Sequence, residues 1–204
     1  MLRSLFPPLK FDWKVVTVTV ASALLLMVDF YHQFAPRKEV DRTVLYFLIP
    51  LFFILVVFRE RPRDFGFALG DWRAGLVITL GSLVVMTPVI WFLGRGDASM
   101  QSYYSGLAGN LPWTVLELFG WEFFFRGWIL FTYARRFGPE AMWLQAVPFA
   151  LAHIGKPEVE TLSTIFGGFA FGWIAWRTKS FLYPFLIHAY IYTLVIFRAS
   201  GLLG

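Results

Sequence analysis

Residues 75–94 read GLVITLGSLVVMTPVIWFLG and contain no acidic or basic side chain. About 20 mostly apolar residues are what a helix needs to cross the hydrocarbon core of a bilayer. Six other stretches have this character or come close to it. The seven membrane spans that we expect are residues 13–30, 43–58, 75–94, 111–133, 140–154, 159–176 and 181–197. The fifth is short, which leaves open an extension or a re-entrant course.

The composition of the whole chain agrees with a membrane protein. Of its 204 residues, 58% are hydrophobic and 15% are charged, whereas a soluble domain carries about 25% charged residues. The absence of cysteine excludes a disulfide scaffold and a cysteine-ligated metal centre. We therefore expect an all-α, multi-spanning helix bundle, with one integral membrane domain over residues 1–204. Its motif-bearing core would be 111–197, with a polar cavity formed by the last four spans.

The net charge of +5 reflects the loops between the spans. Loops on the same side of the membrane as the N-terminus carry more Lys and Arg than those on the other side, which predicts a cytoplasmic N-terminus in the cell (inner) membrane. The first span has no small-residue cleavage site near Asp29, so we expect it to be a membrane span and not a cleaved signal peptide. The expected partners are the lipid bilayer and a membrane-associated peptide or protein, and no nucleic acid.

Ionisable side chains inside the spans are the informative ones. A charge at the centre of a membrane helix costs roughly 2.5–3.5 kcal/mol on insertion scales, so each one needs a partner or a purpose. Apart from Lys14 and Glu140 at the ends of spans, the acidic, basic and histidine residues within the expected spans are Asp29, Glu117, Glu122, Arg126, His153, Glu160 and His188. All but the first lie in the last four spans. The first three spans are therefore interpreted as packing, with any chemistry after Leu111.

Glu122 and Arg126 are four residues apart, in the order that favours pairing on one helix face. One interpretation is a structural ion pair that fixes the helix in the bundle. The other is that Arg126 anchors Glu122 and leaves one carboxylate oxygen for a water molecule.

His153 and His188 lie in two further spans. Together with Glu122 they could act on a shared water, with a carboxylate and an imidazole as general base and as stabiliser of an oxyanion. The same three side chains could instead ligate zinc, which accepts His nitrogen and Glu oxygen and keeps one position open to water. The residue types do not separate these alternatives.

These motifs resemble a known family. Glu-x-x-x-Arg at Glu122 and Arg126, Phe-x-x-x-His at Phe149 and His153, and His188 in the final span occur in order within consecutive spans. In this they resemble the CPBP (CaaX protease and bacteriocin-processing, Abi) family of intramembrane endopeptidases. The resemblance implies a polar cavity in which glutamate and histidines activate water to hydrolyse a peptide bond. It implies no cofactor, with zinc or another divalent metal as the older alternative.

Two positions depart from the family pattern. Trp121 stands where the family has the first glutamate of its Glu-Glu pair, the residue usually assigned as the base. Tyr192 stands where Asn or Asp is common, four residues after His188 and on its helical face, so we expect it to orient that imidazole.

Another carboxylate could replace the missing base. Glu160 follows the break at residues 155–157 and lies in the first turn of the next helix, near the end that carries His153. The alternative is a carboxylate that simply favours the positive end of a helix dipole. Glu117 is about 140° around the helix from Glu122 and cannot share its face.

We therefore predict an intramembrane protease that hydrolyses a peptide bond of a membrane-associated or lipidated substrate. Its site residues are Glu122, His153, His188 and Glu160, supported by Arg126 and Tyr192. The alternative is a non-catalytic CPBP-like membrane binding or chaperone protein that retains the fold, and Trp121 favours it. Proton or ion transport is a weaker alternative, because no internal repeat is visible.

Overall fold

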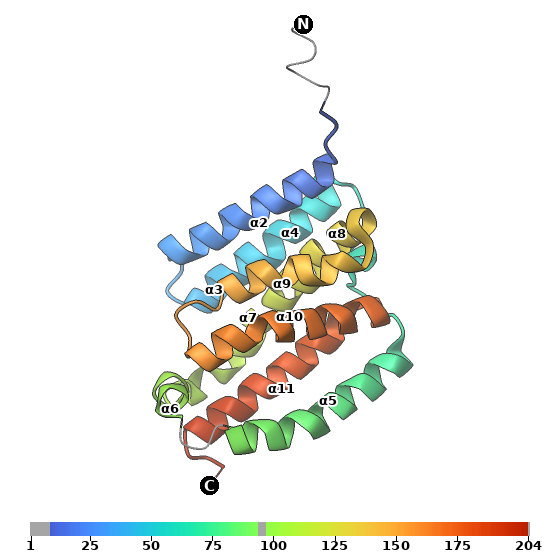
Figure 1. The fold of residues 1–204 in the computed structure, drawn as a ribbon. Helices are drawn as coiled ribbons and strands as arrows, with labels where there is room; N and C mark the ends of the chain where they lie inside the picture. Colours follow the sequence, from blue (N-terminus) through green and yellow to red (C-terminus); the bar gives the residue numbers. More distant parts are fainter. Residues whose placement is uncertain (1–8, 94–96, 204) are drawn as a thin grey trace, which may run out of the picture.

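The computed structural model describes residues 9–93 and 97–203, in which every regular element is helical (Figure 1). The first is α2 (Trp13–Tyr31), which begins at Asp12. The Asp12 carboxylate accepts hydrogen bonds from the backbone N–H groups of Lys14 and Val15. These are donors that a helix start otherwise leaves without a partner.

The second element is a long helix that runs without interruption from residue 38 to residue 57. Its successive segments are α3 (Lys38–Thr43), η1 (Val44–Leu48), α4 (Ile49–Phe52) and η2 (Phe53–Val57). A 3-10 turn, η3 (Pro62–Phe65), and the long helix α5 (Trp72–Leu93) follow.

The C-terminal half holds the elements that carry the site. They are α6 (Ala98–Tyr104), η4 (Ala108–Asn110), α7 (Leu111–Glu122), η5 (Phe123–Ile129), α8 (Leu130–Phe137), η6 (Gly138–Glu140), α9 (Ala141–Leu151), α10 (Glu158–Thr178) and α11 (Leu182–Ala199). α7 passes directly through the π-helical η5 into α8.

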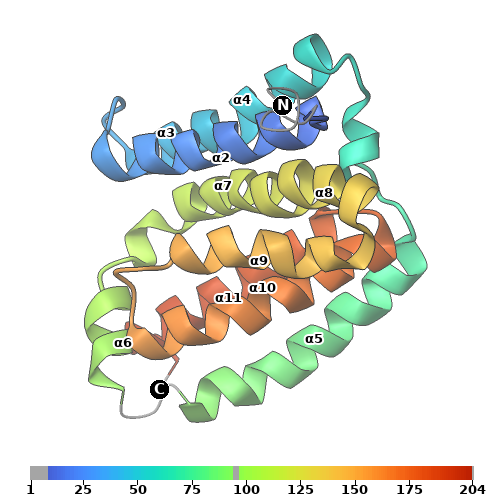
Figure 2. The same ribbon diagram turned by 45° about the horizontal axis from the view of Figure 1, so that its top comes forward.

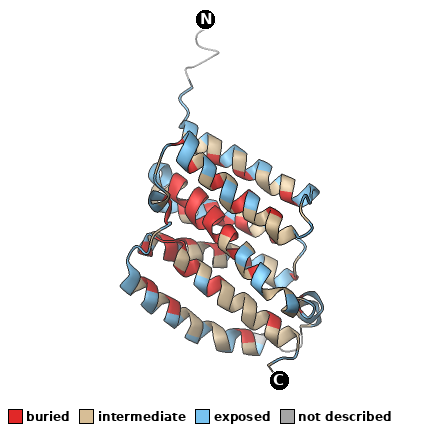
Figure 3. Cartoon of the chain, turned by 180° about the vertical axis from the view of Figure 1, so that it is seen from behind, coloured by how far each residue is buried: buried red, intermediate tan, exposed pale blue. Residues whose placement is uncertain are grey.

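The helices form layers (Figures 1 and 2). α2 and the α3–η2 helix cover one side, α7 to α9 lie in the middle, α10 and α11 come next, and α5 forms the opposite edge. Buried residues concentrate in the middle of the bundle (Figure 3), and all seven residues of η5 are buried. The site residues of the middle layer are therefore shielded on both sides by other helices.

Four of the described helices are long and apolar enough to cross a membrane: α2, the 38–57 helix, α5 and α11. Their outer faces expose large apolar side chains, as Val20 and Leu24 do in α2. Each of the seven expected segments contains a helix, although residue 94 of the third lies outside the described residues. α9 has 11 residues and rises only about 16 Å, roughly half of the hydrocarbon thickness, so it does not cross by itself.

α9 and α10 approach each other closely because α10 presents glycines to α9. A Cβ atom on Gly168 would lie 3.0 Å from the Cβ of Ala146, and one on Gly172 would lie 2.6 Å from Nε2 of Gln145. That Nε2 donates a hydrogen bond to the Gly168 carbonyl at 2.7 Å. Gly168 and Gly172, four residues apart, therefore allow the two helices to pack closely, as pairs of small residues at this spacing do in membrane proteins.

Candidate active site

Glu122 and Arg126 form an ion pair inside the bundle. Both side chains are 0% exposed, and Nη1 of Arg126 lies 3.2 Å from Oε1 of Glu122. The pair lies where α7 changes into the π-helical η5. Turns of this kind are frequent at functional sites because they place side chains at positions that a regular α-helix does not reach.

His188 of α11 bonds to the same carboxylate. Its Nδ1 lies 2.6 Å from Oε1 of Glu122. An ionised carboxylate only accepts, so Nδ1 carries the proton and Nε2 of the neutral ring has a free lone pair. Glu122 therefore fixes both the orientation and the tautomer of His188.

His153 lies in the turn that follows α9. Its Nδ1 donates a hydrogen bond to the Phe149 carbonyl at 2.7 Å, which also leaves Nε2 as an acceptor. Thr161 donates to the His153 carbonyl at 2.8 Å and thereby holds the turn between α9 and α10. The ring of Trp121 meets the His153 ring edge-on, with centroids 5.8 Å apart.

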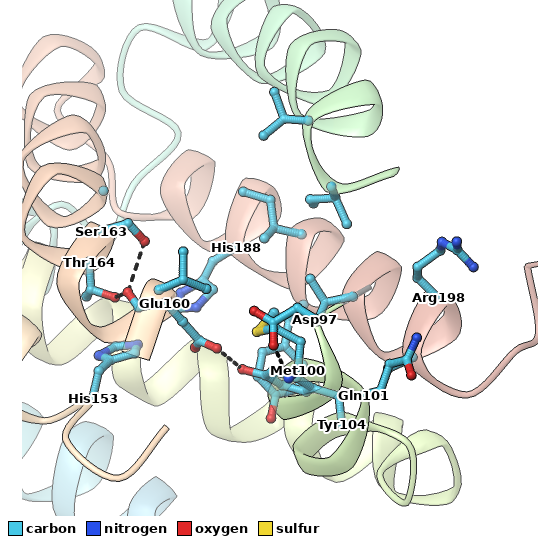
Figure 4. A pocket seen from close by; sticks show the side chains of 18 of the residues that line it. Asp97, Met100, Gln101, Tyr104, His153, Glu160, Ser163, Thr164, His188 and Arg198 are labelled. Atoms are coloured by element: carbon cyan, nitrogen blue, oxygen red, sulfur yellow. Dashed lines mark hydrogen bonds between the residues drawn. The ribbon is translucent and has the colours of Figure 1, made fainter. Parts of the chain in front are cut away.

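A cavity of about 350 Å³ brings these groups together (Figure 4). His153, His188 and Glu160 all line it. Glu122 is not among the lining residues and reaches the cavity only through His188. The polar side chains that we expected to meet in one cavity therefore lie at two depths. The two imidazoles line the cavity wall, and the ion pair lies behind that wall.

Glu160 lines the cavity with both carboxylate oxygens engaged. Oε2 accepts a hydrogen bond from the Tyr104 hydroxyl at 2.5 Å, and Oε1 lies 3.0 Å from Nζ of Lys156. Burial first, and the Glu160 charge second, raise the pKa of Tyr104 above its ordinary value, so this hydroxyl stays a donor. A carboxylate held in this way is poorly placed to take a proton from water.

Tyr192 has other contacts than the one expected from its spacing. Its ring meets the ring of Tyr104 edge-on at 5.4 Å, and Nζ of Lys156 lies 5.4 Å from its centroid. The orientation of His188 that we expected from Tyr192 is supplied by Glu122 instead. A carboxylate beneath the ring is within hydrogen-bond reach of Nδ1, whereas the described contacts of Tyr192 are on the Tyr104 side of the cavity.

The residues before Leu111 contribute more to the site than the sequence suggested. Val89 and Ile90 of α5, together with Met100, Gln101 and Tyr104 of α6, line the cavity. The prediction that the last four spans form the cavity by themselves is therefore wrong, because α5 and α6 complete its wall. A tyrosine in a polar connecting segment gives little signal, because only the fold brings it to a residue 56 positions away.

Two other acidic residues lie outside the site. Nε of Arg42 lies 3.1 Å from Oδ1 of Asp29, and its Nη1 lies 2.5 Å from Oε1 of Glu117. Arg42 thus ties α2, the 38–57 helix and α7 together. Glu117 points away from Glu122, as the 140° separation predicts.

A metal centre does not fit the described residues. In the ranges 9–93 and 97–203, no three His, Asp or Glu side chains gather in an arrangement that could hold a metal ion. Oε1 of Glu122 already accepts from both Arg126 and His188 and lies behind the imidazole. The alternative in which Glu122, His153 and His188 share a metal therefore has no geometric support.

One comparison with known proteins gives a match. A family model described as type II CAAX prenyl endopeptidase Rce1-like matches residues 105–194. Over these residues, which are less than half of the chain, the protein is similar to type II CAAX prenyl endopeptidases. Neither the curated proteins nor the solved structures contain a match to the chain. The matched residues cover α7 to α10 and most of α11, and therefore include Glu122, Arg126, His153 and His188.

Proposed function

We propose that this chain is an intramembrane endopeptidase that hydrolyses a peptide bond of a membrane-associated or lipidated substrate, with His188 as the general base. The observation that carries the proposal is the 2.6 Å bond between Nδ1 of His188 and Oε1 of Glu122, at the wall of a cavity that His153 shares. This arrangement supplies a base although Trp121 replaces the glutamate that usually fills that role.

The hydrolytic step follows from the position of the proton on His188, which is on Nδ1 and leaves Nε2 as the acceptor. Nε2 of His188 takes a proton from a water molecule while the water oxygen bonds to the carbonyl carbon of the scissile peptide. Glu122 stabilises the imidazolium that forms, as a buried carboxylate does for a catalytic histidine. The C–N bond then breaks, and the proton moves from His188 to the leaving amine. The products are a new carboxylate and a new amino terminus.

In this proposal, His153 holds the attacking water. Because its Nδ1 donates to the Phe149 carbonyl, Nε2 can accept a hydrogen bond from that water and aim its oxygen. Arg126 acts on the Glu122 carboxylate, and Phe149 lies beneath its guanidinium with 3.7 Å between the guanidinium carbon and the ring centroid. This stacking keeps Arg126 at Glu122 and away from the cavity.

The test is peptide cleavage by the purified chain in liposomes. A membrane-anchored peptide is the substrate, and mass spectrometry identifies the new amino terminus. His188→Asn keeps a donor for Glu122 but removes the base, and we expect it to lower kcat by about a hundredfold or more. Tyr190→Phe is the matched control on the same helix, since it removes a hydroxyl that bonds to Thr87. Cleavage by His188→Asn at the rate of the control would overturn the proposal.

Trp121 favours a second candidate, a non-catalytic membrane binding or chaperone protein. Its ring fills the space between Tyr46, Phe125 and His153. Under this alternative, Glu122→Ala and Arg126→Ala both lower thermal stability, and His153→Ala leaves function unchanged. An activity that depends on His188 and His153 excludes it.

A further inference from the structure

The short helix α6 lies over the cavity and buries little of its surface against the rest of the protein. Tyr104 is its one buried residue among the described ones and is 1% exposed, whereas Gln101, Ser102 and Tyr103 are exposed. α6 nevertheless supplies Met100, Gln101 and Tyr104 to the cavity wall. An element with so few buried contacts belongs to the part of a protein that opens most easily.

The bond that holds α6 crosses the cavity (Figure 4). The Tyr104 hydroxyl donates to Oε2 of Glu160, in the first turn of α10, at 2.5 Å. Lys156 fixes the other carboxylate oxygen, and the Tyr192 ring packs against Tyr104. A hydrogen bond to an ionised carboxylate is about twice as strong as one between neutral groups.

A second bond is made by Ser105, the residue that directly follows Tyr104 at the C-terminal end of α6. Oγ of Ser200 donates to the carbonyl of Ser105 at 3.0 Å, between exposed groups. Neither residue lines the cavity. Among the hydrogen bonds of the described residues, the one between Tyr104 and Glu160 therefore joins α6 to another part of the cavity wall.

We propose that α6 is a lid over the cavity and that the Tyr104–Glu160 hydrogen bond is its latch. Tyr104 and Glu160 are then positioning residues that control admission of substrate, and Glu160 is not the base. The effect on peptide cleavage rests on the proposed function, whereas the opening of the lid does not.

The chain contains no cysteine, so single introduced cysteines report access directly. Thr164→Cys places a thiol in the cavity wall, where Thr164 is buried. Ser102→Cys places one on the exposed surface of α6. Each is labelled in liposomes with a water-soluble maleimide, with and without Tyr104→Phe. Tyr103→Phe is the matched control, because it removes a hydroxyl from the neighbouring tyrosine and leaves the bond from Tyr104 to Glu160 in place.

We expect Tyr104→Phe to raise the labelling rate of the Thr164→Cys thiol about tenfold, which corresponds to about 1.4 kcal/mol in the opening equilibrium. Tyr103→Phe leaves that rate unchanged, and the Ser102→Cys thiol is labelled at the same rate in every background. Glu160→Ala raises labelling in the cavity as Tyr104→Phe does, and combining both adds nothing further. Equal labelling of the cavity thiol with Tyr104→Phe and with Tyr103→Phe would overturn the lid.

Kinetics separates the latch from a direct catalytic role. With the lid unlatched, Tyr104→Phe and Glu160→Gln shift KM in the same direction and leave kcat close to wild type. A loss of kcat of about a hundredfold or more in Glu160→Gln alone would make Glu160 the base and contradict the latch. If labelling changes as expected but no variant cleaves peptide, the lid stands and the proposed function fails.

Discussion

At the scale of single residues, the site depends on one carboxylate oxygen with two partners. Oε1 of Glu122 accepts from Arg126 at 3.2 Å and from His188 at 2.6 Å, with no exposure to solvent. Burying these charges is costly, and their attraction offsets that cost only while both partners are present. The arrangement therefore makes the stability of the bundle and the proposed chemistry of His188 depend on the same contact.

Removing one partner of the buried pair tests this dependence. We expect Arg126→Met to lower the free energy of unfolding by about 3–5 kcal/mol, because it leaves an unpaired carboxylate in the bundle. The double variant Glu122→Gln with Arg126→Met removes both charges and should recover much of this loss. Denaturant unfolding in detergent gives both values. An Arg126→Met protein as stable as wild type would show that the pair does not hold the bundle.

At the scale of elements, the contact between α9 and α10 positions His153. The turn from His153 to α10 is short, and the hydroxyl of Thr161 bonds back to the His153 carbonyl. A change in the spacing of the two helices would therefore move the imidazole relative to His188.

Neighbouring glycines of α10 provide a matched pair for this contact. We expect Gly168→Ala to destabilise the fold by about 1–3 kcal/mol, because its Cβ would lie 3.0 Å from both Ala146 and Phe149. Gly167→Ala meets open space and should be neutral or stabilising by up to about 1 kcal/mol, as expected for Ala in a helix. Thermal unfolding in detergent compares them, and equal midpoints for the two variants would contradict the close packing.

A second link between elements lies outside the spans. Glu60 accepts from both Lys14 and Arg135, and so ties the start of α2 to α8. Partial burial opposes the ionised form, but the hydrogen bonds and charges of the two basic groups outweigh it, and the pKa of Glu60 is lowered. Its contribution to stability is therefore present above the unfolded pKa and is lost as the pH falls through the folded pKa.

The lowered pKa of Glu60 leads to a prediction for how the stability of Glu60→Gln depends on pH. At neutral pH the variant should be less stable than wild type by roughly 1 kcal/mol, the upper end for a partly exposed ion pair. The difference should disappear in acid, once the wild-type carboxyl is protonated as well. Thermal midpoints measured from neutral pH down into the acid range provide the check. A difference that stays constant over this range would mean that the charge of Glu60 does not contribute.

At the scale of the whole molecule, the sequence predicts the helices better than it predicts the site. Apolar runs and the spacing of Glu122 and Arg126 depend on neighbours along the chain, so these features are recoverable from sequence. The bond from His188 to Glu122 spans 66 positions, and that from Tyr104 to Glu160 spans 56. Such contacts depend on how the layers stack. The sequence therefore suggests Tyr192 as the residue that orients His188, a role that Glu122 fills, and gives no signal for the contact of Tyr104 with Glu160.

The layered arrangement also explains how polar groups persist in a lipid environment. The outer helices present apolar side chains, and the charged pair lies behind two imidazoles at the wall of one cavity. A base that works through a buried carboxylate behaves as one unit with it. Losses from removing either member of such a unit do not add.

A double-mutant cycle on kcat/KM for peptide cleavage in liposomes tests this unit most directly. The variants are Glu122→Gln, His188→Asn and their combination, each compared with wild type. We predict that the combination loses no more than His188→Asn alone, because Glu122 acts on water only through His188. Losses that multiply in the double variant, or unchanged cleavage in His188→Asn, would contradict the account.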